Sequence, residues 1–87
     1  MVISGFEWDD DNIFHIERHE FTPEEVEEVF AGDHKVRRAR LRRYIALGEM
    51  LDGRLAFVVF RRLSGGLVRV VTARDMDASE RRLFRRK

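Results

Sequence analysis

The sequence predicts a small α+β domain in which helices pack on an antiparallel meander sheet, and three observations support this class. The 87 residues suffice for one domain, expected over residues 1–87. Hydrophobic residues make up 44% of the chain, which is enough to form a core. The apolar spacing is helical up to Gly32 and strand-like after it. We therefore expect the order strand, helix, helix, three or four strands, helix.

The N-terminal segment predicts a strand at residues 3–8 and a helix over about residues 10–19. Three consecutive aspartates at 9–11 supply oxygens for the exposed N–H groups of a helix start. Their negative charge also suits the positive end of the helix dipole. Ile13 and Ile16 then fall on the inner face of this helix.

A second helix is predicted over residues 22–31. Thr22 is the expected N-cap, Pro23 takes the first helical position, and Glu25 closes a capping box. Gly32 stands where the helix C-cap belongs. The buried stripe of this helix is expected to be Val26, Val29 and Phe30.

The second half predicts strands at residues 35–40, 43–49, 55–61 and 67–73, with the sheet established after about residue 42. The charged residues of the first of these strands suit a sheet edge. Asp52-Gly53 and the Ser-Gly-Gly at 64–66 indicate turns, and Asp77 with Glu80 predicts a capping box that opens a last helix through Phe84. The expected core includes Trp8, Ile13, Val26, Val29, Phe30, Ile45, Phe57, Val59 and Val71.

The charge is divided unevenly along a chain whose net charge is only +1. Residues 1–33 hold eleven acidic side chains and one basic one, whereas residues 34–87 hold five acidic and sixteen basic ones. Fifteen of the seventeen basic residues are arginine, which binds phosphate through a planar fork as lysine does not. The basic half therefore indicates an acidic partner, with nucleic acid the first candidate, although ion pairs that reinforce the surface would use the same residues.

Several classes of protein are excluded by what the sequence lacks. The absence of cysteine excludes disulfide scaffolds, thiolate zinc sites and cysteine nucleophiles. No apolar run approaches the roughly 20 residues needed to cross a bilayer, and the start lacks the features of a signal peptide. We expect a cytoplasmic protein with no membrane partner.

A series of motifs spans nearly the whole chain: Phe-Glu-Trp-Asp at 6–9, Arg-His at 18–19, Thr-Pro-Glu-Glu-Val at 22–26, Arg-Tyr-Ile-Ala-Leu-Gly at 43–48, Gly-Arg at 53–54, Val-Val-Phe at 58–60, Thr-Ala-Arg at 72–74 and Glu-Arg at 80–81. In this order they resemble the BrnT toxin family. Arg18 and Glu20 depart from the Lys and Gly usual there, and His15 stands at the place of a frequent Asn.

This resemblance implies a RelE-like fold and a ribonuclease toxin of a type II toxin–antitoxin system that stops translation. It implies RNA as substrate, no cofactor, and neutralisation by a ribbon-helix-helix antitoxin of the BrnA type. The assembly would be a homodimer or a toxin–antitoxin hetero-oligomer. The competing interpretation is a non-catalytic module of the same fold that binds nucleic acid or protein.

Metal-independent cleavage of RNA needs a group that takes the 2′-hydroxyl proton, a group that protonates the leaving oxygen, and donors for the transition state. The residues available to move protons are His15, His19, His34, Tyr44 and Glu80. The resemblance favours His19, and the alternative is an exposed or capping histidine at a helix end. His15 and His19, four residues apart, could share a helix face as metal ligands, but no third ligand completes a known motif. We expect an endoribonuclease without a metal.

Arginines supply the phosphate contacts in this hypothesis. Arg74, at the end of a valine-rich strand, is the expected catalytic arginine and should meet His19 in one basic cleft; the alternative is an ion pair with Asp75, Asp77 or Glu80. The expected phosphate-binding residues are Arg43, Arg62 and Arg69. The C-terminal basic residues are expected to form a solvated tail or an antitoxin contact: Arg81, Arg82, Arg85, Arg86 and Lys87.

Overall fold

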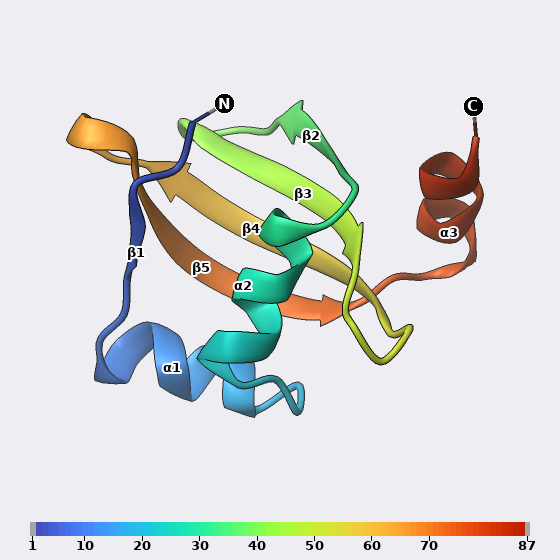
Figure 1. Cartoon of the computed structure of the whole chain (residues 1–87), viewed down its shortest axis with the longest axis horizontal. Coiled ribbons are helices and arrows are strands. Elements are labelled where there is room, and N and C mark those ends of the chain that lie inside the picture. The colour runs from blue at the N-terminus through green and yellow to red at the C-terminus, as the bar shows by residue number, and fades with distance from the viewer. Residues whose placement is uncertain (1, 87) are drawn as a thin grey trace.

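The computed structural model describes residues 2–86, and its five-stranded sheet has the order β1-β5-β4-β3-β2 (Figure 1). The α+β class is confirmed. The elements follow in the chain as β1 (Gly5–Glu7), α1 (Asp10–Glu17), α2 (Pro23–Ala31), β2 (His34–Arg38), β3 (Arg43–Glu49), β4 (Leu55–Arg62), β5 (Leu67–Asp75) and α3 (Ala78–Arg85). A short 3₁₀ turn, Ser64–Gly66, joins β4 to β5.

Strands β2 to β5 form the predicted antiparallel meander, and β2 is the predicted edge strand. The meander starts at His34, earlier than the expected position near residue 42. Strand β1 is shorter than predicted and lies at the opposite edge, parallel to β5, with Gly5 beside Leu67. The sheet is therefore a meander with one added parallel strand.

Each of the three helices begins with a capping box, in which the N-cap side chain and the side chain three residues later each accept a backbone N–H. Two of the boxes confirm the sequence prediction, and the box of α1 pairs Asp9 with Asn12 rather than using the aspartates alone. The pairs are Asp9 with Asn12, Thr22 with Glu25, and Asp77 with Glu80.

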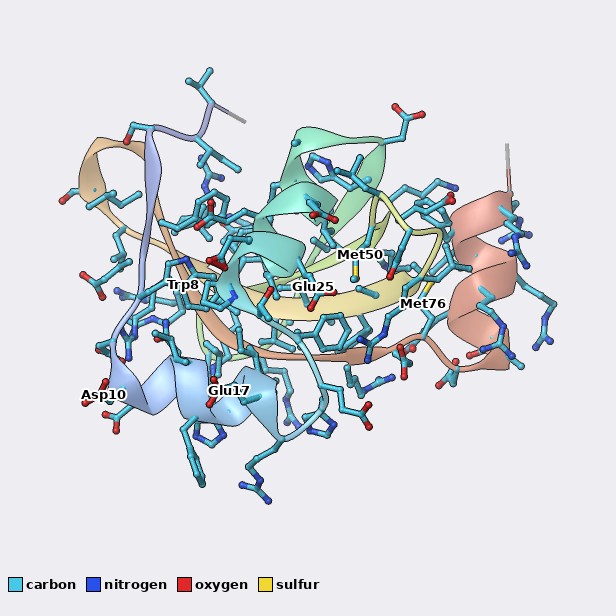
Figure 2. The ribbon with its side chains drawn as sticks, turned by 60° about the horizontal axis from the view of Figure 1, so that its bottom comes forward. Trp8, Asp10, Glu17, Glu25, Met50 and Met76 are labelled. Carbon is cyan, nitrogen blue, oxygen red and sulfur yellow. The ribbon has the colours of Figure 1, made fainter. Side chains whose placement is uncertain are left out.

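Helix α1 ends at Glu17, before the predicted end near residue 19; Asp10 and Glu17 mark its two ends in Figure 2. The backbone N–H of Glu20 donates to the carbonyl of Glu17, and that of Phe21 donates to the carbonyl of Ile16. Glu20 takes a φ of +65°, the left-handed conformation that usually calls for glycine after a helix. The family that the sequence resembles usually has a glycine at this position. This chain keeps the left-handed backbone conformation there, although it has Glu20 in place of the glycine that best suits it.

Helices α1 and α2 pack on one side of the sheet, here named the covered face (Figure 1). Val26, Val29 and Phe30 are buried there as predicted, while Trp8 and Ile13 are only half-buried. The strands contribute the remaining core side chains of this face: Ala46, Ala56, Val58, Phe60, Val68, Val70 and Ala73.

The prediction was wrong for the core positions of the strands. The side chains predicted there are half-buried on the other side of the sheet, here named the open face: Ile45, Phe57, Val59 and Val71. They alternate with the core residues, because successive side chains of a strand point to opposite faces. A bulge also shifts the register, since Val59 pairs with Thr72 while the next residue, Phe60, pairs with Val70.

Helix α3 stands apart from α1 and α2 and packs against the open face at β3 (Figure 1). Met76 lies where the chain passes from β5 to this helix (Figure 2). Nζ of Lys35 on β2 donates to the backbone carbonyls of Leu83 and Arg86 at the end of α3. A cation at this end compensates the negative pole of the helix, so Lys35 ties α3 to the edge of the sheet.

Candidate nucleic-acid interface

Arg69, predicted to bind phosphate, is held by two carboxylates instead. Its Nη1 lies 3.0 Å from Oε1 of Glu7 and 2.8 Å from Oδ2 of Asp9, and its Nη2 lies 3.2 Å from Oδ1 of Asp9. The Arg69 guanidinium holds the pKa of the Asp9 carboxyl below its ordinary value of 3.8. The charge of Arg69 is therefore compensated, and the residue ties β1 and the start of α1 to β5.

Acid is expected to weaken the fold, because the pKa values of Asp9, Asp77 and Glu80 are all lowered in the folded protein. When folding lowers the pKa of a carboxyl group, its charged form stabilises the fold. This contribution is fully present at a pH above the ordinary pKa of the group, and it is lost as the pH falls through the lowered pKa of the folded protein. Urea midpoints should therefore stay level above about pH 5 and fall steadily below about pH 4. Asp9→Asn, which can still cap α1, should reduce this acid sensitivity; an unchanged pH profile in that variant would contradict the role given to Asp9.

Arg74 also has a carboxylate partner, as the alternative interpretation allowed. Its Nη1 and Nη2 each lie 2.8 Å from one oxygen of the Glu80 carboxylate, in a bidentate pair. Its guanidinium also lies over the ring of Phe57, 3.8 Å from the centroid. The Arg74 guanidinium lowers the pKa of Glu80 and fastens the start of α3 to the open face. RNA would have to displace Glu80 to reach this arginine.

His19 lies in the turn after α1, which packs on the covered face, whereas Arg74 points to the open face. Its backbone carbonyl accepts a hydrogen bond of 2.8 Å from Nη2 of Arg54, and the same guanidinium covers the ring of Phe21. The structure does not bring His19 and Arg74 into the single cleft that the sequence predicted. Because α1 stops at Glu17, His15 and His19 also do not share a helix face. A catalytic role for His19 stays a prediction.

A hollow of about 520 Å³ lies where the β2–β3 turn meets the end of β4. Within the described part of the chain, the arginines that line it make no ion pair, unlike Arg54, Arg69 and Arg74. No carboxylate of residues 2–86 lines it. Here named the Tyr44 pocket, it is lined by Arg38, Ala39, Arg42, Arg43, Tyr44 and Arg62.

The fold fixes the Tyr44 side chain firmly. Its ring stacks on that of Phe60, with centroids 5.6 Å apart and planes at 26°, and Phe60 is completely buried. Tyr44 pairs across the strands with both Phe60 and Arg38, and the guanidinium of Arg62 lies 5.4 Å from its ring centroid. The guanidinium of Arg38, and next that of Arg62, lowers the pKa of the Tyr44 phenol from its ordinary value of 10.0.

The turn that carries two of these arginines is strained. Leu41 and Arg42 have φ values of +58° and +59°, a conformation that hairpin turns usually reserve for Asn and Gly. The turn closes with a hydrogen bond from the N–H of Arg43 to the carbonyl of Arg40. Such a residue costs about 1–3 kcal/mol, and strain of this kind concentrates at functional sites. The turn presents Arg42 and Arg43 to the Tyr44 pocket.

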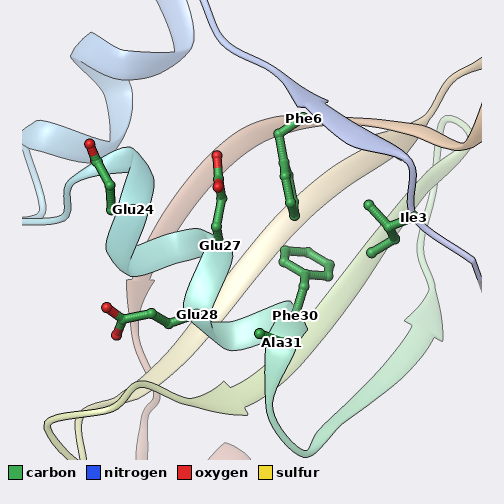
Figure 3. A pocket seen from close by; sticks show the side chains of 7 residues that line it. All are labelled: Ile3, Phe6, Glu24, Glu27, Glu28, Phe30 and Ala31. Atoms are coloured by element: carbon green, nitrogen blue, oxygen red, sulfur yellow. The ribbon is translucent and has the colours of Figure 1, made fainter.

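A second hollow, of about 550 Å³, lies between α2 and β1 (Figure 3). Its apolar lining residues are Ile3, Phe6, Phe30 and Ala31, and the carboxylates of α2 lie along one side of it. Oε2 of Glu27 accepts a hydrogen bond of 2.7 Å from Nε1 of Trp8. The carboxylates that line this hollow, here named the acidic groove, are those of Glu24, Glu27 and Glu28. They would repel phosphate groups, so the acidic groove does not suit RNA.

The sequence analysis named two of the four arginines that line the Tyr44 pocket. Arg43 and Arg62 were predicted and lie together, whereas Arg38 and Arg42 were missed and Tyr44 was considered only as a proton carrier. The signal that could have found Arg38 is its register opposite Tyr44 across a short hairpin. Between residues 2 and 86, no three His, Asp or Glu side chains are grouped as metal ligands would be, and no helix is long and apolar enough to cross a bilayer.

The fold and this pocket define a small α+β protein with a surface cluster of arginines that make no ion pair among residues 2–86. Residues 8–80 match the family described as the ribonuclease toxin BrnT of type II toxin–antitoxin systems. The chain belongs to this family. No curated protein matches the sequence.

Proposed function

We propose that this chain acts as an endoribonuclease toxin that grips the RNA backbone in the Tyr44 pocket. The observation that carries the proposal is a pocket lined by four arginines and no carboxylate. A guanidinium binds phosphate bidentately and stacks on bases, so this lining suits a single-stranded RNA. The expected cleavage of RNA uses no metal ion, and it stops translation by destroying RNA.

The further parts of the proposal follow from family membership. The antitoxin is expected to be a ribbon-helix-helix protein, the toxin fold is expected to be RelE-like, and the cytoplasm is the expected location. Helix α3 has no buried residue, and its exposed arginines suit a contact with the antitoxin; Lys87 lies outside the described residues. The exposed residues of this end are Arg81, Arg82, Arg85 and Arg86.

Removing two pocket arginines should weaken RNA binding in a salt-dependent way. For single-stranded RNA, the slope of log affinity against log salt falls by about 0.7 for each phosphate neutralised. Arg43→Gln with Arg62→Gln should therefore make this slope about 1.4 less negative and weaken binding to a labelled single-stranded RNA of mixed sequence. Fluorescence anisotropy at several salt concentrations measures both quantities.

The control is Arg18→Gln, which removes one positive charge at the end of α1, half of the change in the double variant. Its RNA affinity and slope should equal those of the unchanged protein. Equal losses for each charge removed in the control and the double variant would show that net charge, rather than the Tyr44 pocket, holds the RNA. Expression of the chain with and without its antitoxin, followed by growth and RNA integrity, tests the toxin activity. Tight RNA binding without any cleavage would instead favour the non-catalytic module.

A further inference from the structure

We infer that the Tyr44 pocket is also where RNA is cut, with the Tyr44 phenol as the group that takes the proton of the 2′-hydroxyl. This inference rests on the proposed function, because it assumes that RNA enters the pocket. The substrate class is a single-stranded RNA phosphodiester with a 2′-hydroxyl next to the bond that breaks.

The lining of the pocket leaves one candidate for proton transfer. Arginine holds its proton too tightly to act as an acid or base, and alanine has none to exchange. No histidine and no carboxylate lines the pocket. Tyr44 is therefore the one lining side chain that can gain and lose a proton during cleavage.

The surroundings of Tyr44 favour its charged form. Arg38 and Arg62 lower the pKa of the phenol, which raises the fraction of phenolate near neutral pH. Stacking on the buried Phe60 holds the ring in place, so that its oxygen has little freedom to move away. A base fixed in position, with a pKa shifted downward, is favoured on both counts that general base catalysis depends on, which are geometry and pKa.

The step balances as an internal transesterification. The Tyr44 phenolate takes the 2′-hydroxyl proton, the 2′-oxygen forms a bond to phosphorus, and the bond from phosphorus to the 5′-oxygen breaks. The 5′-oxygen takes a proton from water, and the phenol then returns its proton to the solvent. The products are a 2′,3′-cyclic phosphate and a 5′-hydroxyl, and the pocket arginines stabilise the additional negative charge at phosphorus.

Four other residues could move the proton, and none of them lines the Tyr44 pocket: His15, His19, His34 and Glu80. Glu80 is bound in its bidentate pair with Arg74, beyond the lining of the Tyr44 pocket. His19 lies in the turn after α1 and is also absent from that lining. If any of these residues were the base, RNA would have to be cut outside the Tyr44 pocket.

Tyr44→Phe tests the inference, because phenylalanine keeps the ring on Phe60 and removes only the hydroxyl. Single-turnover cleavage of a labelled single-stranded RNA should slow by about 10²–10⁴-fold, as expected for loss of a general base. Binding of the same RNA with all 2′-hydroxyls methylated should stay within about twofold, since the arginines remain. The rate of the unchanged protein should rise with pH toward the pKa of the phenol, and this rise should be absent in Tyr44→Phe.

The controls separate the inference from the proposed function. Glu24→Gln, in the acidic groove, should cleave RNA at the unchanged rate, and melting curves should show that Tyr44→Phe is folded. Full cleavage by folded Tyr44→Phe, or products ending in a 5′-phosphate, would overturn the inference while leaving the ribonuclease intact. Loss of cleavage in His19→Ala or Glu80→Gln with Tyr44→Phe unaffected would do the same. No cleavage by the unchanged protein, with or without ribosomes, would overturn the proposed function itself.

Discussion

Phe60→Ala is expected to lower the free energy of unfolding by about 3–5 kcal/mol, as removal of a large buried ring usually does. Phe60 is fully buried, and its ring meets that of Phe30 edge-on at 5.1 Å and that of Tyr44 in a stack at 5.6 Å. The substitution therefore removes apolar burial and two aromatic contacts at once. Domains of this size have about 5–15 kcal/mol of stability in total, so this one substitution should remove a large share of it. Urea unfolding followed by circular dichroism measures the loss.

The control for this variant is Phe14→Ala, which deletes the same atoms from a side chain that is 62% exposed. It should change stability by no more than about 0.5 kcal/mol, as surface substitutions do. A loss below about 1 kcal/mol for Phe60→Ala would mean that the cavity collapses and that the ring is not central to the core.

Asn12→Ala is expected to lower the free energy of unfolding by about 2–4 kcal/mol, although asparagine is a small polar residue. Asn12 is 2% exposed, and its Nδ2 donates to the carbonyls of Glu7 and Val70 at 2.9 and 3.0 Å. Its Oδ1 accepts from the N–H of Asp9 at 2.8 Å, within the capping box of α1. The substitution takes this partner from the buried carbonyl of Val70 and from the part-buried backbone groups of Glu7 and Asp9. An unsatisfied buried group costs about 1–3 kcal/mol.

His15→Ala is the matched control, because His15 lies on the same helix and is exposed. Its stability should stay within about 0.5 kcal/mol of the unchanged protein. A small loss for Asn12→Ala in the same urea experiment would imply that water replaces the amide. In that case the side chain would not hold α1 against β1 and β5.

The features predicted correctly from the sequence are the local ones. Thr22 and Glu25, like Asp77 and Glu80, are three residues apart, and a capping box needs nothing beyond that spacing. Strand β3 was predicted with its exact bounds, because its alternation is closed by turns on both sides. The Asp9–Asn12 box has the same spacing and was missed because its second residue is Asn rather than the usual Glu or Gln. The bond from Asn12 to the carbonyl of Val70 on β5 is one that no local pattern indicates.

The prediction of which face of the strands is buried was wrong for a physical reason. β3, β4 and β5 carry apolar side chains on both faces, so alternation alone does not tell which face the helices cover. The bulge opposite Val59 then changes the parity within β5, so that Val70 and Ala73 share a face. A fixed period of two cannot follow such a change.

Only part of the candidate site was predicted, because whether an arginine has a carboxylate partner depends on contacts between distant elements. Arg69 and Arg74 were correctly expected at strand positions, but their partners Glu7, Asp9 and Glu80 come from other elements. Sequence spacing gives the residue types that can form an ion pair and does not say which arginines stay uncompensated. Arg38 and Arg62 converge on Tyr44 only through the register of three strands.

The parallel pairing of β1 with β5 has a consequence for the biosynthesis of the chain. Gly5 pairs with Leu67 and Glu7 with Arg69, so the strand synthesised first cannot be paired until most of the protein has been translated. Pairing between segments so distant in the sequence raises the contact order and slows folding. During translation the acidic segment with β1, α1 and α2 leaves the ribosome before strands β2 to β5, which cover most of its apolar side chains. The hydrogen bonds of Asn12 and Arg69 that link the N-terminal segment to β5 can therefore form only after β5 has been synthesised.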